Sequence, residues 1–517
     1  MNRTTLSLFA GTAALAAVTA FAAVDSPSAS GAAPAAAARL PVERTSLVCP
    51  APSTSDLAET TYTSFTPVTK GAASGGRARL QAAGEQSADD GSGDDGKQKD
   101  GKQKDGKEKE KDGKEKKSAG KQAGQPVLTP KAPGTPATGD TSGGDTPALV
   151  GTADGSFAPG WTVQETTEVA AGTGRGLLGV TCAGADTDFW FPGASTAAGR
   201  TDYVHLTNPD DSAAVVDIEL YGKDGAIKAP LGENLTVDPG ASEAILLPTL
   251  TEDRQTDLTV HVSVRGGRVG AAVRALDDKA GGDWLAPAAD PADGLVLPGI
   301  PKDATDVRLT AFVPGDDDAD LKIRLASPDG LITPAGNETI HVKSGMTTTV
   351  DLGDVTRGEP GSLVLTPADQ AVPVVAALQV VRGKGDKRET AFIPATAPVG
   401  TRATSAGNSA KGTTLALSAP EGTATVKVTA SAGSEGGTPA TKTYTIKSGT
   451  TQNVDAPVPT GLKGTYALTV EPVSGGPLYA ARTLTSGDTA FTVQTLPTDH
   501  GLVSVPQTRE DLSILQK

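Results

Sequence analysis

The chain has 517 residues, a net charge of −15, 3% aromatic residues, 62 Gly and 37 Pro. The negative charge argues against a nucleic-acid partner, because phosphate binding needs concentrated positive charge. The few aromatic residues argue against one large enzyme core, and the length suits three or four small β-rich domains.

The first 24 residues have the pattern of a secretory leader. Arg3 precedes an apolar run from Leu6 to Val24, with small residues at Ala20 and Ala22 where a signal peptidase could cut. The run is also long enough to span a bilayer. Residues 1–24 are therefore expected to be a signal peptide or an uncleaved membrane anchor. Both alternatives place the rest of the chain outside the cytoplasm, either secreted or attached to the membrane only through residues 6–24.

Residues 39–80 together with 148–198 are expected to form an N-terminal β domain that holds both cysteines. In an exported chain an even pair favours a disulfide, here Cys49–Cys182. Two Cys and four scattered His form no zinc or iron–sulfur spacing, so we expect no metal and no cofactor.

Residues 81–147 separate the two parts of this domain. They contain the repeated unit DGKQK or DGKEK from Asp95 to Lys117, followed by a run rich in Pro, Gly and Thr. Val127 and Leu128 are the only large apolar residues beyond the start of the segment. Such a composition cannot bury enough apolar area to offset ordering entropy, so we expect a disordered insertion. Lys97 to Lys121 carries 11 Lys against 6 acids, which makes a locally basic patch.

Beyond residue 199 the chain repeats about every 105 residues. Alternating strand residues meet a Pro-Gly or Ser-Gly turn at Gly240, Gly345 and Gly449, and a second alternating stretch follows each turn. The repeats are expected at residues 199–298, 299–398 and 399–506, followed by a tail at 507–517. An aromatic residue among apolar ones also recurs, at Trp190, Trp284, Phe392 and Phe491. We therefore expect Trp190 to close the N-terminal domain as the others close the repeats.

This pattern predicts an all-β protein of tandem immunoglobulin-like β-sandwiches. The alternative is a β-propeller, but propeller blades usually repeat at about 40–50 residues, which is much shorter than this period.

Two motifs suggest chemistry but have simpler explanations. Gly174 to Gly179 matches the dinucleotide-binding pattern G-x-G-x-x-G, yet β-branched residues follow where a helix is required, so a tight turn is expected. Asp316 to Asp320 offers several carboxylates for calcium, but it lacks the Gly and Glu of an EF-hand loop and lies at a strand–strand turn. No catalytic residues are expected.

Trp161, Trp190 and Trp284 could form an exposed sugar-stacking platform. Their recurrence within the units favours instead a plug in the core or between domains.

Several segments resemble an uncharacterised family of exported actinobacterial proteins. They are TSLVCP (Thr45 to Pro50), GRGLLGVTC (Gly174 to Cys182), FWFPGA (Phe189 to Ala194) and the strand–turn–strand stretch YVHLTNPDDSAAVVDIELYG (Tyr203 to Gly222). The resemblance implies export and a β-rich architecture. It carries over no functional residue.

The sequence therefore predicts a non-catalytic, exported cell-envelope protein that acts as a structural spacer or interaction module. The expected partner is an envelope protein or a wall polysaccharide. Two alternatives stay open, a carbohydrate-binding module that uses exposed Trp and an extracytoplasmic hydrolase with a site at a domain junction.

Overall fold

A computed structural model of the chain describes residues 38–84 and 125–505. Over these residues the protein is all-β with open sheets, as predicted. The only helical segments there are the short 3-10 helices η2 (Gly155–Phe157), η3 (Pro230–Gly232), η4 (Leu247–Thr249) and η5 (Gly385–Lys387). Within the described part of the chain, no helix has the length and apolar character needed to cross a bilayer. The expected leader at 1–24, the charged repeat at 95–117 and the tail at 507–517 lie outside the described residues.

The chain divides into two units. One comprises residues 1–40 and 503–517, and the other is the compact unit Pro41–Leu502. Near the boundary, β1 (Ala38–Pro41) pairs with β37 (Leu502–Val505) in a two-stranded sheet.

The compact unit contains four modules, each made of two sheets that face each other across an apolar core. We call the sheet that holds a module's first strand its leading sheet. The sheet that holds the module's last strand is its closing sheet.

Modules 1 and 2 have the following strands. The leading sheet of module 1 has the order β2 (Arg44–Cys49), β6 (Leu149–Asp154), β4 (Ala78–Ala82). The closing sheet of module 1 has the order β5 (Ala137–Ser142), β3 (Ala58–Phe65), β7 (Thr162–Val169), β8 (Gly176–Thr181). The leading sheet of module 2 has the order β12 (Gly225–Ile227), β11 (Ala214–Gly222), β15 (Leu258–Gly266), β9 (Asp188–Ala194), with β13 (Leu235–Val237) also on β11. Its closing sheet has the order β14 (Ser242–Leu246), β10 (Arg200–Thr207), β16 (Gly270–Asp277), β17 (Gly281–Leu285).

Modules 3 and 4 follow the same plan. The leading sheet of module 3 has the order β18 (Leu295–Ile300), β24 (Gly361–Pro367), β20 (Ala319–Ser327), β21 (Gly330–Ile332), and β22 (Thr339–Val342) also pairs with β20. The closing sheet of module 3 has the order β23 (Thr347–Asp351), β19 (Ala304–Phe312), β25 (Val375–Arg382), β26 (Glu389–Pro394). The leading sheet of module 4 has the order β27 (Ala403–Asn408), β34 (Tyr466–Gly475), β29 (Ala424–Ala430), β31 (Ala440–Ile446). The closing sheet of module 4 has the order β32 (Thr450–Val454), β28 (Thr413–Ala419), β35 (Tyr479–Ser486), β36 (Ala490–Thr495). A small sheet pairs β30 (Gly436–Thr438) with β33 (Thr460–Lys463).

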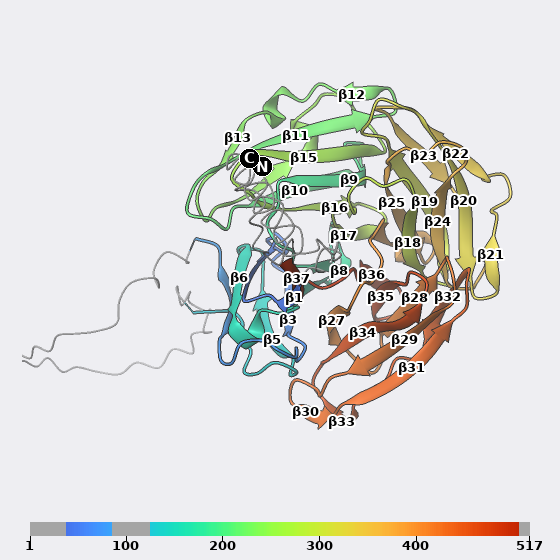
Figure 1. Cartoon of the computed structure of the whole chain (residues 1–517). Coiled ribbons are helices and arrows are strands. Elements are labelled where there is room, and N and C mark those ends of the chain that lie inside the picture. Colours follow the sequence, from blue (N-terminus) through green and yellow to red (C-terminus); the bar gives the residue numbers. More distant parts are fainter. Residues whose placement is uncertain (1–37, 85–124, 506–517) are drawn as a thin grey trace, which may run out of the picture. The chain divides into compact units, whose positions relative to one another are not determined.

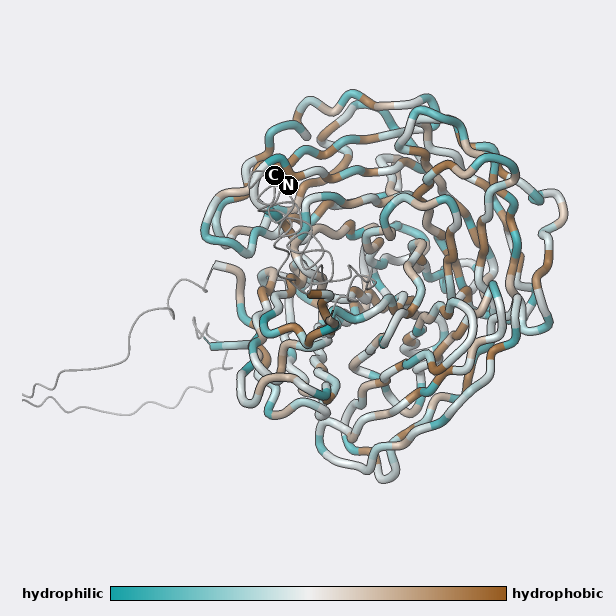
Figure 2. The backbone as a smooth tube through the Cα atoms, in the orientation of Figure 1, coloured by the Kyte–Doolittle hydropathy of each residue, from teal (hydrophilic) through white to brown (hydrophobic). Residues whose placement is uncertain are grey.

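Two burial patterns distinguish the strands. In β29 every second residue is buried, namely Ala424, Val426, Val428 and Ala430, because one face meets the core and the other does not. In β18 and β26 every residue is buried, because both faces are covered. Figure 2 shows the hydrophobic residues concentrated along the strands and the hydrophilic ones in many of the connecting loops.

The repeated Pro-Gly and Ser-Gly turns join opposite sheets. Gly240, Gly345 and Gly449 have positive φ values of 66°, 66° and 74°, as tight turns require. The strands on either side of Gly240, β13 and β14, pair with β11 and β10 in different sheets. Each turn is therefore a crossing between the two sheets of its module and not a hairpin.

The modules close into a ring within residues 41–502 (Figure 1). The leading sheet of each module packs on the closing sheet of the next, as β9 does on β25, β18 on β35, β27 on β3 and β2 on β16. The last strands form an inner circuit in which β8 contacts β17, β17 contacts β26, β26 contacts β36, and β36 contacts β8. The tandem repeats of this unit therefore form a closed ring, which resembles a propeller in its face-to-face packing.

The predicted insertion is too long. Residues 81–84 and 125–147 are ordered parts of module 1, since β5 pairs with β3 and Leu128 is buried beside Leu80. The backbone N–H of Val127 donates to the carbonyl of Leu80 at 2.8 Å. The short polar residues of β5 can form a strand here because β5 lies at the edge of its sheet and is stabilised by pairing with β3. The chain leaves module 1 after Gly84 and returns at Gln125 beside the same strand.

Trp190 does not close the N-terminal domain. It lies on β9, which pairs with β15 and so opens module 2. The strands that close the modules are β8, β17, β26 and β36, of which the last three carry Trp284, Phe392 and Phe491. Most of β9 is buried, as the last strands are, and β9 therefore has the same apolar, aromatic pattern as β17.

Candidate functional site

The four last strands meet at one buried carboxylate, that of Asp283 on β17. Its Oδ1 accepts hydrogen bonds from the backbone N–H of Gly179 at 2.9 Å, from that of Trp284 at 2.8 Å and from the Thr492 hydroxyl at 3.2 Å. The backbone of Phe392 also stabilises the carboxylate. One side chain thus contacts all four modules. Burial raises the pKa of Asp283 well above its usual range, against the opposing effect of these hydrogen bonds.

The glycines of the G-x-G-x-x-G pattern allow the modules to approach one another. A Cβ on Gly174 would lie 2.8 Å from Leu276 of module 2, and one on Gly179 would lie 2.6 Å from Thr492 of module 4. A Cβ on Gly176 would collide with the carboxylate of Glu389 in module 3. The run enters strand β8 and not a helix. Dinucleotide binding is therefore excluded, and the glycines serve close packing around the ring centre.

A cavity of about 220 Å³ lies at the carboxyl ends of the four last strands. Residues at or just after the end of each strand line it, including Thr181, Pro287, Pro394 and Pro497. Rings from three modules contribute to the wall, namely Trp161, Trp284 and Phe392. We call this space the axial cavity. It is a concave, largely apolar site with a few polar groups, the usual character of a ligand pocket.

Two buried hydrogen-bond donors among the residues of the axial cavity have no partner in the described part of the chain. They are Nε1 of Trp284, a residue 2% exposed, and Nε2 of Gln494, a residue 5% exposed. Buried polar atoms are normally paired, and an unpaired one costs about 1–3 kcal/mol. Both atoms have essentially no exposed surface themselves, so they lie within the packed wall and not on its open side.

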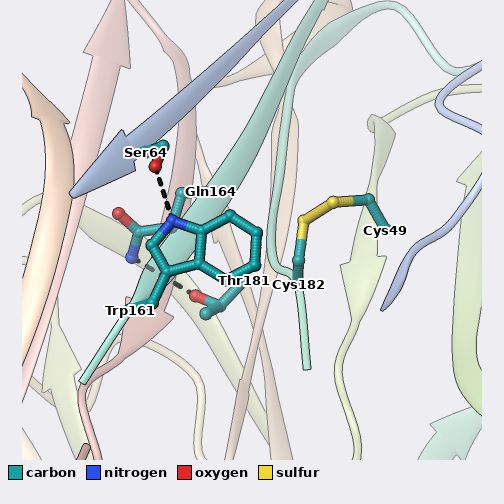
Figure 3. Close-up of a disulfide and its surroundings, with 6 residues drawn as sticks. All are labelled: Cys49, Ser64, Trp161, Gln164, Thr181 and Cys182. Carbon is teal, nitrogen blue, oxygen red and sulfur yellow. Dashed lines mark hydrogen bonds between the residues drawn. A yellow bond between two sulfur atoms is a disulfide. The ribbon is translucent and has the colours of Figure 1, made fainter. Parts of the chain in front are cut away.

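The indole nitrogen of Trp161, by contrast, has a partner. Nε1 of Trp161 donates to Oγ of Ser64 at 2.7 Å, and Nε2 of Gln164 donates to Oγ1 of Thr181 at 3.3 Å (Figure 3). The Cys49–Cys182 disulfide lies beside the ring of Trp161 in the same view and joins two residues 133 positions apart. This wall of the cavity is thus held by hydrogen bonds and by a covalent link.

Arg482 is fully buried and holds the amide of Gln494. Its Nε donates to Oε1 of Gln494 at 2.7 Å, and its Nη1 donates to the Ala406 carbonyl and, at 3.2 Å, to Oδ1 of Asn408. Because Oε1 is the acceptor in this contact, Nε2 is the free donor of the amide. Burial lowers the pKa of Arg482 to about 9, so the side chain is cationic at neutral pH.

An ion pair lies at the edge of the axial cavity. Nε of Arg402 lies 2.5 Å from Oδ2 of Asp499, and Nη1 of Arg402 donates to Oγ1 of Thr69 at 3.1 Å. The hydrogen bond from Arg402 to Thr69 ties module 4 to module 1. Asp499 is the only carboxylate among the described residues of the cavity wall, and Arg402 already neutralises it.

A second recess, of about 370 Å³, lies at the amino ends of three of the last strands. It collects carboxylates from three modules, namely Glu168, Asp386, Glu389 and Asp488. Nη2 of Arg175 donates there to the carbonyls of Lys279, Asp386 and Arg388 and so links modules 1, 2 and 3. Burial raises the pKa of Glu389 to about 7, although Arg175 lies 3.7 Å away and opposes the shift.

The three Trp residues are buried, with exposures of 5% for Trp161, 9% for Trp190 and 2% for Trp284. An exposed stacking platform of these rings is therefore excluded. Trp190 stacks on His261 at 3.8 Å and on Phe312 of module 3 at 5.3 Å, so it is an intermodule plug. The structure brings Trp161 and Trp284 together at the axial cavity and places Trp190 elsewhere.

The Asp316 to Asp320 turn is held by its own contacts. Oδ1 of Asp318 accepts the backbone N–H of Ser344 at 2.8 Å, and His341 contacts Asp320 at 2.9 Å. The described residues contain no cluster of His, Cys, Asp and Glu suited to a metal ion.

Sequence reasoning missed Asp283, Gln494 and Arg482. A signal was present, because each is a charged or amide residue inside a short, otherwise apolar or Thr-rich strand. Such a residue is costly to bury unless it has a specific partner.

A family model described as a family of unknown function (DUF5719) matches residues 137–457. The chain belongs to this family. The DUF5719 match runs from β5 of module 1 through modules 2 and 3 and into module 4. It includes Asp283 and Trp284 and ends before Arg482 and Gln494. No curated protein and no solved structure matches the chain.

Proposed function

We propose that this DUF5719 protein is a non-catalytic, exported binding module of the cell envelope and that the axial cavity is its ligand site. The observation that carries the proposal is the cavity itself, a concave and largely apolar space of about 220 Å³ that residues of all four modules line.

Export is supported by two features. The apolar run from Leu6 to Val24 follows the secretory pattern, and a disulfide joins Cys49 to Cys182. On this proposal the modules are variants of the immunoglobulin-like sandwich, since each packs two antiparallel sheets over one core. The partner would be an envelope protein or a wall polysaccharide that offers a group small enough for the cavity.

The acids of the axial cavity favour binding over hydrolysis. Glycoside cleavage needs two carboxylates across the reacting bond, and the described wall offers Asp499 alone, paired with Arg402. The acids of the second recess lie at the opposite ends of the strands. Arg175 lies among them and donates to backbone carbonyls.

Tryptophan fluorescence can test the proposal. In a Trp190→Phe background the remaining Trp residues, Trp161 and Trp284, both line the axial cavity. The full exported chain would be titrated with glucose, N-acetylglucosamine, glucuronic acid and inorganic phosphate. We expect a saturable change in emission with at least one probe, and loss of that change in an Ala286→Phe variant that narrows the cavity.

A flat response to every probe would contradict the proposal, and so would an unchanged response in Ala286→Phe. Circular dichroism and the unfolding temperature of each variant would show that the fold is retained.

A further inference from the structure

We propose that residues 497–501 form a strap over the axial cavity that opens separately from the ring and controls entry to the cavity. The strap follows β36, the last strand of module 4, and leads into β37. Its opening can be measured without a ligand, whereas its importance for a ligand rests on the proposed function.

The strap forms one side of the axial cavity. Four consecutive residues of the strap, Pro497 to His500, are among the lining residues. Residues 497–501 belong to no strand, and both Pro497 and His500 are exposed. The cavity is therefore bounded here by a single segment of chain, whereas β17 and β26 bound it with buried strand residues such as Trp284 and Phe392.

Polar contacts hold the strap to the linker that precedes β27. Oγ1 of Thr498 accepts a hydrogen bond from the backbone N–H of Gly400 at 2.5 Å. The backbone N–H of Asp499 donates to the Arg402 carbonyl at 2.7 Å, and the Asp499 carboxylate forms the ion pair with Arg402 described above. No apolar side chain of the strap is buried. A segment held in this way opens at a lower free-energy cost than one that packs in the core.

The strap crosses the junction between module 4 and module 1. Linkers along the chain join modules 1, 2, 3 and 4 in order, but module 4 is the last and has no linker to module 1. The carbonyl of Gly501 accepts the backbone N–H of Val42, which precedes β2 of module 1, at 3.1 Å. A Cβ on Gly160 of module 1 would lie 2.5 Å from Oδ2 of Asp499, so the ion pair lies directly against module 1. Opening of the strap would therefore release these contacts without breaking a strand pairing within any module.

The segments that follow two other last strands are fixed more firmly. Cys182, after β8, forms the disulfide with Cys49. The backbone N–H of Ala288, after β17, donates to the Trp190 carbonyl at 2.9 Å, and this segment leads into β18, in which every residue is buried. The strap leads instead into β37, in which every residue is exposed. We therefore expect the strap to be the first part of the cavity wall to open.

Amide hydrogen exchange of the full chain tests whether the strap opens by itself. Asp499 and Ala288 each donate a backbone hydrogen bond of similar length, 2.7 Å and 2.9 Å, so the protection of the two amides can be compared. We expect the amide of Asp499 to exchange about a hundredfold faster than that of Ala288. Equal protection would overturn the inference, because the strap would then open only together with the rest of the ring.

A reversible lock tests whether the strap controls entry. A Cβ on Gly400 would lie 3.8 Å from Cβ of Thr498, a separation typical of a disulfide. Gly400→Cys/Thr498→Cys should therefore form a bond that keeps the strap closed, and a reductant should release it. In a Trp190→Phe background, Trp161 and Trp284 report on the cavity that they line. Acrylamide, a small neutral quencher, should quench their emission about threefold more slowly in the oxidised variant than in the reduced one.

Asp499→Ala should have the opposite effect. It removes the ion pair with Arg402, so acrylamide quenching should be about threefold faster than in the parent Trp190→Phe chain. Asp303→Ala is the matched control, because Asp303 forms an ion pair with Arg382 in module 3 and does not line the cavity. Its quenching should equal that of the parent chain. The parent chain with and without reductant controls for the native disulfide.

The outcomes separate the strap from the proposed function. Equal quenching in the oxidised and the reduced lock, or slower quenching in Asp499→Ala, would overturn the strap and leave the binding function standing. None of these measurements uses a ligand of the cavity. Failure of every probe in the titration above would therefore overturn the proposed function, and acrylamide quenching would still decide whether the strap controls entry.

Discussion

The carboxylate of Asp283 in module 2 accepts a hydrogen bond from the backbone N–H of Gly179 in module 1 at 2.9 Å. The two residues are 104 positions apart and lie on adjacent last strands of the ring. The same oxygen accepts the hydroxyl of Thr492 in module 4. The contacts of this one carboxylate therefore depend on closure of the ring.

Replacing Asp283 tests its role as the central acceptor. Asp283→Ala leaves several buried donors without a partner, so we expect a loss of about 3 kcal/mol in the free energy of unfolding. Asp283→Asn keeps an acceptor oxygen and is neutral, so it should cost less than the alanine variant. Urea denaturation of both variants would measure the difference. Equal losses would show that the acceptor oxygen is not what matters.

Gly179→Ala tests the close approach of modules 1 and 4. The added Cβ would lie 2.6 Å from Cγ2 of Thr492, and overpacking of this kind typically costs about 1–3 kcal/mol. Thr492→Ser removes that methyl group and keeps the hydroxyl that Asp283 accepts. The double variant should therefore recover much of the loss in a double-mutant cycle. Additive effects would contradict the predicted contact.

Glu389 predicts a pH dependence of stability. Its pKa rises from the ordinary 4.5 to about 7 in the folded chain, chiefly because of burial, so the folded state favours the neutral acid. The contribution of Glu389 to the free energy of unfolding is therefore complete below pH 4.5 and is lost as the pH rises to about 7. The free energy of unfolding of the wild type minus that of Glu389→Gln should fall over this range. Denaturation at several pH values would measure it, and a flat or rising difference would refute the assignment.

The Cys49–Cys182 disulfide can be tested by the mass of the exported protein and by its free energy of unfolding. A non-reducing mass measurement of exported protein should find Cys49 joined to Cys182. The bond closes a loop with a sequence separation of 133, so its reduction should cost about 5 kcal/mol on the chain-entropy estimate. Cys49→Ala/Cys182→Ala should unfold at correspondingly lower urea. Two free thiols in freshly exported protein would contradict the pairing.

Deletion of residues 85–124 tests the boundaries of the insertion. The chain leaves and re-enters module 1 beside Leu80, whose backbone N–H donates a hydrogen bond to the carbonyl of Leu128. A short Gly-Ser connection should therefore preserve the fold and keep the free energy of unfolding within about 1 kcal/mol or raise it. A matched deletion of residues 125–142 removes Leu128 and β5 and should destabilise module 1. If the two deletions had equal effects, residues 125–142 would not be the structural part of the segment.

Patterns within single strands were readable from the sequence. The alternation in Ala424 to Ala430 identifies a strand with one buried face, because neighbouring side chains point to opposite sides of a sheet. The turn glycines Gly240, Gly345 and Gly449 were also identified, since their positions need positive φ. The sheet in which each following strand pairs was not readable. A hairpin and a crossing between sheets have the same local pattern.

Burial on both faces removed the distinction between first and last strands. Trp190 on β9 and Trp284 on β17 lie in similar apolar surroundings, although one strand opens module 2 and the other closes it. The polar composition of Ala137 to Ser142 was misleading for a related reason. An edge strand such as β5 can be stable through its partner β3 without a large apolar side chain of its own.

The sequence alone determined the β class, the repeat and the pairing of the two cysteines, because these follow from local periodicity and from simple counting. Only the tertiary structure decided that the repeats close into a ring and that Asp283 reaches all four modules. It also decided that Trp161, Trp284 and Gln494 line one cavity. The physical reason is that each contact joins strands from different modules. Their proximity depends on how whole sheets pack, and no short stretch of sequence encodes it.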